Sequence, residues 1–229
     1  MKKIVFIGAL LLVFSVHGQS KVTKNLGDYS ILKVYNGIEV TLIKSTEHKL
    51  EITGSKSEKV KIKNVNNTLK LSLPFSLKPS NNYADGKVLI KIYYKNNIDI
   101  IDANEGATIT GKDFKQDKVA IKAQERALIN LVLASKNIIV RSSSGGIVKL
   151  TGTAKNQDVN VDLYGVYHGF GLKVENSSLV KAGTGAKAEV FTGKTLNAKV
   201  SFGGSIFYKG NPEIIRDKKV IGGIIQKKD

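Results

Sequence analysis

The sequence SSSGGIVKLTG at residues 142–152 contains the pattern on which the fold depends: small residues suited to a tight turn, then alternating apolar and polar side chains. Related units recur every 19 or 20 residues between about Ile98 and Pro212. They lie at residues 107–111, 127–131, 166–170, 187–191 and 204–210. A fixed repeat of this length is typical of a solenoid, in which each coil buries its apolar edge against its neighbours.

A second strand-like segment precedes most of these units. The segments cover residues 118–123, 137–142, 158–163, 178–183 and 197–202. Two strands and a third short side in about 20 residues fit one turn of a β-helix, whose layers stack at about 4.8 Å. We therefore predict an all-β fold, a single-stranded right-handed parallel β-helix of roughly ten coils.

Glycines recur at the same place in successive units, as in Gly145, Gly165 and Gly203. Glycine reaches positive φ without strain, so we expect these positions to form the corners of the coils. A glycine-rich phosphate cradle is the alternative, but cradles of that kind precede helices, whereas these glycines precede strands.

The N-terminal third also alternates apolar and polar residues, as one-sided strands do. The alternating segments are residues 31–43, 49–54, 59–65 and 68–74. Between the last two, Asn66 and Asn67 fit either a hairpin turn or a corner between coils. Residues 75–87 break the pattern and are predicted to form an exposed loop.

The N-terminus has the pattern of a secretory signal peptide. Lys2 and Lys3 precede an apolar run over residues 4–16 that is too short to span a bilayer comfortably. We predict cleavage after residue 18, so that residues 19–229 form one exported β-helix domain. No Cys follows the apolar run, which argues against a lipoprotein. The tail, residues 218–229, is expected to cap the last coil, with a sorting role as an alternative.

Composition restricts the chemistry. The 229 residues include 36 Lys and Arg against 19 Asp and Glu, a formal net charge of +17, and no Cys. Disulfides, thiolate metal sites and Cys nucleophiles are therefore excluded. A basic field attracts polyanions such as acidic polysaccharides or anionic headgroups, although lysines could also simply solvate the rod. Only Arg126, Arg141 and Arg216 are arginines, so specific nucleic-acid readout is not predicted.

Candidate catalytic residues are few. The predicted mature chain, residues 19–229, has only His48 and His168, and we expect His168 to pack against a neighbouring tyrosine. Two acidic groups, Asp99/Asp102/Glu105 and Asp158/Asp162, do not place two carboxylates about 5 to 10 Å apart on one face, as a glycosidase needs. A lyase on acidic polysaccharide, using Arg126 or Arg141 with bound Ca²⁺, is the enzymatic alternative. No cofactor and no metal site are predicted.

Four residues are predicted to line a ligand-binding face: Tyr164, Tyr167, Lys149 and Lys187. An exposed aromatic ring can stack on a sugar while a lysine holds an acidic group. Phe191 and Phe207, in contrast, occupy the apolar positions of their units and are expected in the core.

Three segments carry a resemblance to a known family. YNGIEVTLIK at residues 35–44, residues 142–152, and GGSIFYKGNP at residues 203–212 resemble the auto-transporter adhesin head GIN domain family, an uncharacterised group of secreted β-helical proteins common in Bacteroidetes. The resemblance covers residues 26–215. The family's Ser-Gly-Ser-Gly-Asp corner has lost its Asp here, since Ile147 and Ser205 follow the glycines. The resemblance implies a cell-envelope or surface location and an adhesive role, and it supplies no catalytic residue.

The sequence thus predicts an exported, non-enzymatic, adhesin-like binding module with a basic face for anionic glycans or envelope polymers. Its location would be the periplasm, the outer-membrane surface or the extracellular space. The alternatives are the lyase, and a structural rod that self-associates through its ends or an open strand edge. Ligand identity and oligomeric state stay open.

Overall fold

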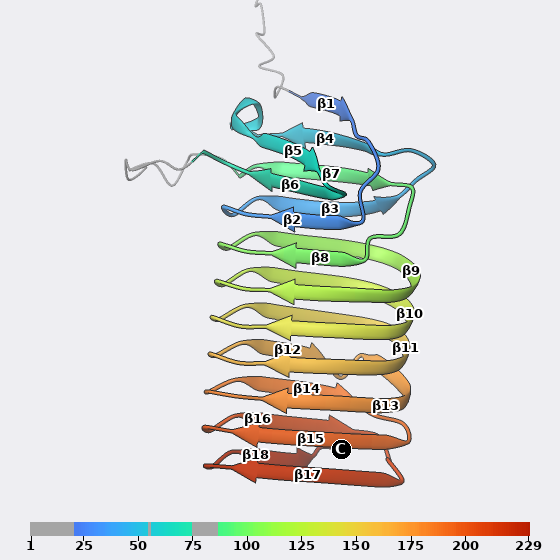
Figure 1. Ribbon diagram of the computed structural model, residues 1–229, viewed down its shortest axis with the longest axis vertical. Coiled ribbons are helices and arrows are strands. Elements are labelled where there is room, and N and C mark those ends of the chain that lie inside the picture. The colour runs from blue at the N-terminus through green and yellow to red at the C-terminus, as the bar shows by residue number, and fades with distance from the viewer. Residues whose placement is uncertain (1–20, 55, 75–86) are drawn as a thin grey trace, which may run out of the picture.

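The computed structural model describes residues 21–54, 56–74 and 87–229. The predicted signal peptide, residues 1–18, lies outside these residues, as does nearly all of the predicted loop at residues 75–87. The remaining chain forms a β-solenoid of about seven turns, with parallel coils of about 19 residues (Figure 1). The predicted all-β solenoid is confirmed.

Each coil contributes to two facing sheets, which we call the front and back sheets after their positions in Figure 1. The front sheet consists of β6 (Thr68–Ser72), β2 (Ile31–Val34), β8 (Ile100–Ala103), the second halves of β9 (Thr108–Ala123), β10 (Leu128–Ser142), β11 (Ile147–Val161) and β13 (Leu172–Ala182), then β15 (Thr195–Ser201) and β17 (Ile214–Val220).

The back sheet consists of β7 (Leu89–Tyr94), β3 (Glu39–Lys44), the first halves of β9, β10 and β11, then β12 (Val166–Gly169), β14 (Lys187–Phe191), β16 (Ser205–Lys209) and β18 (Ile224–Lys227). Neighbouring strands in both stacks are parallel and nearly in register, so equivalent residues of successive coils form columns.

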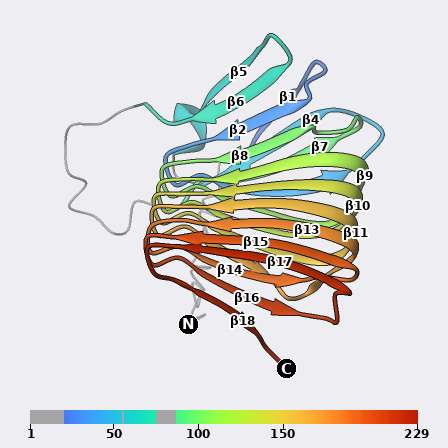
Figure 2. The same ribbon diagram turned by 60° about the horizontal axis from the view of Figure 1, so that its bottom comes forward.

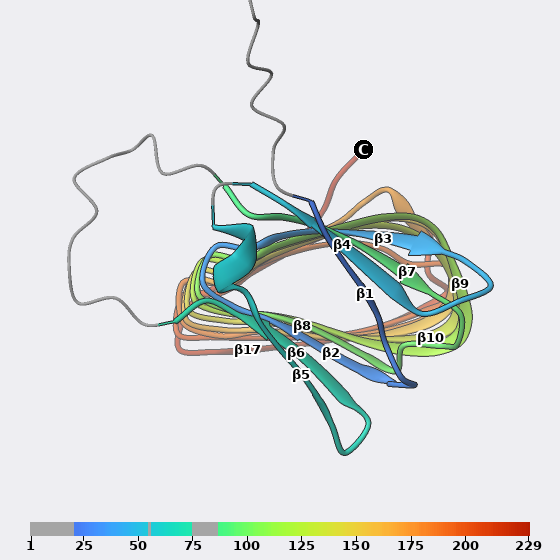
Figure 3. The same ribbon diagram turned by 90° about the horizontal axis from the view of Figure 1, so that it is seen from above.

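The two sheets meet in different ways at their two sides. On one side the strand runs on through a wide bend, which is why β9, β10 and β11 each belong to both sheets (Figure 3). On the other side a tight turn with two consecutive residues at positive φ reverses the chain, as at Ser144 (φ 51°) and Gly145 (φ 73°). Two such residues are the signature of a type I′ turn. The predicted glycine corners are therefore confirmed at Gly145 and Gly203, whereas Gly165 directly follows its turn and does not have positive φ.

Aliphatic columns fill the space between the sheets. One column joins Ile109, Ile129, Val148 and Tyr167 in successive coils, and all four are fully buried. Because side chains alternate across a strand, every second residue enters this core and the residues between them face solvent. Each coil is thus stabilised mainly by the coils above and below it.

The N-terminal strands form an antiparallel cap instead of further coils. β4 (Lys49–Thr53) pairs antiparallel with β7 on one side and with β1 (Val22–Asn25) on the other. β5 (Lys61–Val65) pairs antiparallel with β6 through Asn66 and Asn67, both at positive φ, and a single 3-10 turn, η1 (Ser57–Lys59), precedes it. The hairpin reading of this turn is confirmed, and the expectation of about ten coils was too high because these strands close the end of the rod.

Among the described residues, the C-terminal end has no such cap. β17 and β18 form the last coil and pair only with the coil before them (Figure 2). The tail at residues 218–229 lies largely in β17 and β18, which stack on the coil of β15 and β16 and so cover the last unit predicted from the sequence, but this added layer is itself open. In β17, Asp217 and Lys219 align with Ala198 and Val200 of the preceding coil, whose side chains point into the core. The last coil therefore has charged residues at two core-facing positions.

A polar cluster interrupts the apolar core between β11 and the back sheet. The Tyr167 hydroxyl donates to Gln157 Oε1 at 3.0 Å, Gln157 Nε2 donates to Ser178 Oγ at 2.9 Å, and Thr192 Oγ1 donates to the same oxygen at 2.8 Å. All four side chains are buried. Because each hydroxyl or amide finds a partner, the cluster avoids the penalty of unsatisfied buried polar groups.

His48 makes stability depend on pH. Its buried Nε2 and the Tyr29 hydroxyl have no hydrogen-bond partner in the described residues, and the two rings lie 5.0 Å apart. Burial lowers the pKa of His48 below its ordinary value of 6.5. The Asp28 carboxylate, whose Oδ1 lies 3.4 Å from His48 Nε2 without forming a hydrogen bond, opposes this shift without cancelling it. The unfolded chain therefore binds the proton more readily, and stability should fall as pH drops from about 6.5 through the folded-state pKa.

The variant His48→Phe should remove this part of the pH dependence. Chemical denaturation of wild type and variant at a series of pH values between 7.5 and 5, chosen to bracket the ordinary histidine pKa of about 6.5, measures the difference. His168→Asn is the matched control, because His168 is half-exposed and pairs with Glu189. Equal acid sensitivity of wild type and His48→Phe would contradict the assignment.

Candidate functional site

A column of basic side chains runs along the outer surface of the front sheet. Strand register places the following residues in one column, in spatial order: Lys70, Lys33, Asp102, Lys122, Arg141, Asn160, Lys181, Lys199 and Lys218. We call its seven cationic members the basic ladder. With layers about 4.8 Å apart, the column from Lys70 to Lys218 is about 40 Å long.

The basic ladder is most uniform toward the C-terminal end. Lys181, Lys199 and Lys218 occupy three consecutive layers, are exposed, and form no ion pair within the part of the chain that the structure describes. Like charges directly opposite on neighbouring strands destabilise a sheet by a few tenths of a kcal/mol to about 1 kcal/mol per pair. A bound anionic polymer would relieve this repulsion.

Two acidic residues modify the ladder near its middle. Asp102 fills one position, is nearly buried, and accepts a hydrogen bond from Asn104 Nδ2 at 3.0 Å. Arg141 Nη1 lies 3.0 Å from Asp158 Oδ1 in the next layer. The ladder therefore carries its largest unpaired charge below Arg141, over β13, β15 and β17.

In the described part of the chain, the back sheet has no comparable column. Its central outward column contains, in spatial order, Lys91, Thr41, Thr110, Asn130, Lys149, His168, Glu189, Phe207 and Gln226. Two lysines, one histidine, one carboxylate and five uncharged side chains share that column, so it forms no continuous basic stripe. The central outward column of the front sheet is therefore rich in lysine, whereas that of the back sheet is not.

Two of the four predicted ligand residues, Lys149 and Lys187, lie on this back sheet. Lys187 Nζ is 2.8 Å from Glu189 Oε1, and His168 Nδ1 is 2.7 Å from Glu189 Oε2. Burial alone would raise the pKa of Glu189, but the hydrogen bonds from Lys187 and His168 outweigh it and lower that pKa. Lys187 is thus already paired, and His168 pairs with a carboxylate instead of a tyrosine.

The two tyrosines have opposite environments. Tyr167 is fully buried in the core, so the prediction that it is exposed on a ligand face was wrong. Its place in the strand explains this, because it shares the inward register of Val148. Tyr164 sits on a corner turn and is 69% exposed. The expected core positions of Phe191 and Phe207 were also wrong, since both are outward-facing and half-buried.

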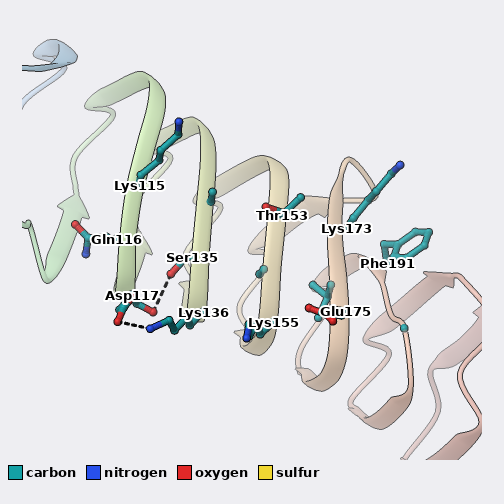
Figure 4. Close-up of a pocket in the computed structure, with 14 residues that line it drawn as sticks. Lys115, Gln116, Asp117, Ser135, Lys136, Thr153, Lys155, Lys173, Glu175 and Phe191 are labelled. Atoms are coloured by element: carbon teal, nitrogen blue, oxygen red, sulfur yellow. Dashed lines mark hydrogen bonds and ion pairs between the residues drawn. The ribbon is translucent and has the colours of Figure 1, made fainter.

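A shallow groove of about 780 Å³ lies along the wide bend (Figure 4). Its lining includes Ala134, Ala154 and Phe191, and the side chains of Lys115 and Lys173 project outward from it. At its lower border Lys136 Nζ binds Asp117 Oδ2 at 2.7 Å, and the Ser135 hydroxyl donates to the Asp117 carbonyl at 3.2 Å. These contacts tie successive coils together at the bend and leave a basic, partly apolar surface.

Three of the acidic residues considered for catalysis, Asp102, Asp158 and Asp162, have structural partners. Asp162 Oδ1 accepts hydrogen bonds from the backbone N–H groups of Leu163 and Thr184, both at 2.8 Å, and so joins two corners. Asp158 pairs with Arg141, and Asp102 with Asn104. Within residues 21–54, 56–74 and 87–229, no cluster of three or more His, Cys, Asp or Glu could hold a metal ion. The same residues include no helix long and apolar enough to cross a membrane.

Comparison of the sequence with models of known families gives one match over most of the solenoid. A family model described as "Putative auto-transporter adhesin, head GIN domain" matches residues 28–212. The chain belongs to this family. The match covers the solenoid from the start of β2 to the end of β16 and confirms the resemblance noted in the sequence. Membership in an adhesin-like family suggests a surface or secreted protein.

Solved structures share the fold of this head GIN domain. A "putative adhesin" from Bacteroides fragilis NCTC 9343 has a TM-score of 0.81 at 20% identity, covering 93% of this chain and 98% of that one. From Parabacteroides distasonis ATCC 8503, a "putative adhesin" scores 0.64 at 19% identity, covering 92% and 97%. A "putative lipid binding protein" from the same strain scores 0.62 at 19% identity, covering 93% and 98%.

None of these three descriptions is of an enzyme. No curated protein matches the chain. At this level of identity the solved structures establish the fold alone, so the function must be argued from the surface of this chain.

Proposed function

We propose that the protein is an exported, non-enzymatic surface module that binds a linear polyanion along the basic ladder. The observation that supports this proposal is the alignment of Lys181, Lys199 and Lys218 in consecutive layers without carboxylate partners in the described chain. An acidic polysaccharide of the envelope or the extracellular matrix is the ligand class. Its role would be adhesive, in keeping with the family.

The geometry favours a polymer over a small anion. Cations repeat at the layer spacing of about 4.8 Å along a straight column, close to the length of one sugar in an extended chain. Lys181, Lys199 and Lys218 stand exposed on a sheet face, so each contact is weak alone, and affinity comes from many contacts made together. A polymer with one acidic group per sugar can meet several layers at once.

The ladder is built mainly from lysine, and this sets the kind of recognition. A lysine ammonium is a compact point charge on a flexible stem, whereas arginine offers a planar fork for bidentate readout. Binding should therefore tolerate different acidic groups and weaken strongly as salt screens the charges. Specific nucleic-acid recognition is not expected from such a surface.

Removing three ladder charges should abolish most of this binding. In the variant Lys181→Gln/Lys199→Gln/Lys218→Gln, the loss of on the order of 1 kcal/mol per lysine near an anionic surface predicts roughly hundredfold weaker binding to polygalacturonate at low salt. Isothermal titration or polysaccharide-affinity electrophoresis measures the change, with neutral dextran as the blank.

The matched control removes three lysines from the back sheet. Lys91→Gln/Lys112→Gln/Lys149→Gln lowers the net charge by the same amount but leaves the basic ladder intact. This control should bind polygalacturonate within a few-fold of wild type. Equal losses in both triple variants would mean that net charge alone attracts the polymer, and the ladder would have no special role.

A further inference from the structure

The corner turns opposite the wide bend stack into a continuous edge of the rod, at the left in Figure 1. Backbone hydrogen bonds link successive turns, as from Gly145 N to Leu163 O at 3.1 Å and from Tyr164 N to Thr184 O at 2.9 Å. Equivalent turn residues therefore lie one above another, and their side chains project from a convex ridge.

In the C-terminal half, large apolar side chains occupy this ridge. Leu163, Tyr164, Phe202 and Ile221 are 49%, 69%, 57% and 70% exposed. We call these four residues the apolar edge. In the N-terminal half the corresponding turns carry Glu105, Glu125 and Arg126. The change from charged to apolar side chains divides the ridge into two chemically different parts.

The backbone at the apolar edge is unfavourable for these residue types. Leu163, Tyr164, Phe202 and Ile221 all have positive φ, between 46° and 61°. Glycine or asparagine adopts this conformation readily, whereas bulky and β-branched residues do so with strain. Other turns of the stack do use glycine, as at Gly106 and Gly145. Strained and exposed apolar residues stabilise neither the turn nor the core, and such outliers point to function.

One glycine makes room for the edge. A Cβ on Gly185 would lie 2.6 Å from Cε1 of Tyr164, so the tyrosine ring covers the turn of the next coil. The ring thus extends the apolar surface from Leu163 toward Phe202 across the intervening turn. The four side chains form a row and are not isolated exposed residues.

The apolar edge is flanked by the strongest part of the basic ladder. Lys181, Lys199 and Lys218 each lie three residues before the first corner position of their own coil. The nearest carboxylate on the edge, Asp162, already accepts two backbone hydrogen bonds. A convex row of apolar tips beside a row of lysines resembles the arrangement with which peripheral proteins enter the interface of an anionic bilayer.

We propose that the apolar edge inserts into the headgroup region of an anionic lipid layer while the neighbouring lysines contact its phosphates. A folded partner would need a matching concave groove for these protruding tips, whereas a fluid lipid interface adapts to them. Tyrosine and phenylalanine are well suited to that interface. The charged turns at Glu105, Glu125 and Arg126 offer no apolar side chain to insert, so the rod would dock by its C-terminal half. The inference shares three lysines with the proposed polyanion function but depends on different side chains.

A tryptophan reporter tests insertion directly, because the chain has no Trp. The variant Tyr164→Trp should show a blue shift of its emission when vesicles of phosphatidylcholine and phosphatidylglycerol are added. Lipids brominated near the headgroup should quench it. Pure phosphatidylcholine vesicles should give a much smaller shift. An unchanged spectrum with the anionic vesicles would overturn the proposal.

A second variant separates the apolar edge from the ladder. Leu163→Asn/Phe202→Asn/Ile221→Asn keeps every lysine, and asparagine accepts the positive φ, so the fold should be retained. Partitioning to the anionic vesicles at moderate salt should fall more than tenfold, as expected from losing three partly buried apolar side chains. Polygalacturonate binding should stay at the wild-type level.

Other results would exclude the lipid interface. If the asparagine variant partitions like wild type, any vesicle binding is due to charge alone and the edge has no role in it. If sedimentation shows a wild-type dimer that the asparagine variant dissociates, the edge is an interface between two copies of the chain. Either result overturns insertion and leaves the polyanion function to be judged by the ladder variants.

Discussion

Replacing Gly152 with alanine should destabilise the solenoid by about 4 kcal/mol, the sum of backbone strain and an overlap inside the coil stack. Gly152 has φ +112°, a region that residues with a Cβ rarely adopt. An added Cβ would also lie 2.0 Å from the carbonyl oxygen of Leu133 in the preceding coil. The backbone of one coil would have to move away from its neighbour, at the expense of the hydrogen bonds between them.

Two other glycines separate these effects. Gly106 has positive φ, and an added Cβ there would meet no atom within 4 Å, so Gly106→Ala should cost only about 1 kcal/mol of strain. Gly146 has no positive φ, but its Cβ would lie 2.2 Å from the Ala123 carbonyl oxygen, so Gly146→Ala should lose about 2 kcal/mol. Urea denaturation of the three variants gives the comparison. Equal losses at Gly152 and Gly106 would show that the close approach between coils is unimportant.

The repeat predicted the solenoid because it constrains the backbone directly. Segments of equal length with recurring glycines, such as Gly145 and Gly203, can only stack with their turns aligned. The N-terminal third lacked this constraint. The alternation of apolar and polar residues in β4 and β5 predicts which side chains are buried, but it does not determine whether the neighbouring strand is parallel or antiparallel. The antiparallel cap therefore could not be derived from the pattern.

The candidate site was present in the sequence but was not recognised there. Lys122, Arg141, Lys181 and Lys199 each stand three residues before the first corner residue of their own coil. Aligning the units would have shown a basic column. The exposure of Tyr167 was predicted wrongly for a related reason. Tyr167 occupies the same position in its coil as the buried Val148 does in the preceding coil, so its side chain faces inward. In a solenoid, the position within the coil determines exposure more strongly than residue type.

The corner residues could not have been assigned from residue type at all. Phe202 would ordinarily be placed in a strand or the core, and Tyr164, although predicted to be exposed, would not be placed in a turn, since turns with positive φ favour glycine and asparagine. Only the structure shows that they occupy turns, and that Gly185 leaves room for the ring of Tyr164. Residues that contradict local preference in this way are expected at functional surfaces.

Substituting the inward charges of the last coil should make the rod associate end to end. Asp217 and Lys219 continue the columns of Ala198 and Val200, which are buried. An open strand edge is a template for pairing with another chain, and inward-pointing charges are one way in which proteins block it. In Asp217→Val/Lys219→Val the final layer would present a continuous apolar surface with unpaired backbone groups. Sedimentation velocity at increasing concentration should then show oligomers larger than those of wild type.

This test isolates the position of the charges, because the double substitution leaves the net charge unchanged. Lys218→Val serves as the control: it removes a charge from the same strand at an outward position and keeps Asp217 and Lys219. Its sedimentation should match that of wild type. If the double variant also sediments like wild type at high concentration, the inward charges do not protect the end, and the unpaired edge of β17 and β18 must be blocked in another way. The self-associating rod predicted as an alternative would require this end to accept a further layer, and two charged side chains on its core face oppose that.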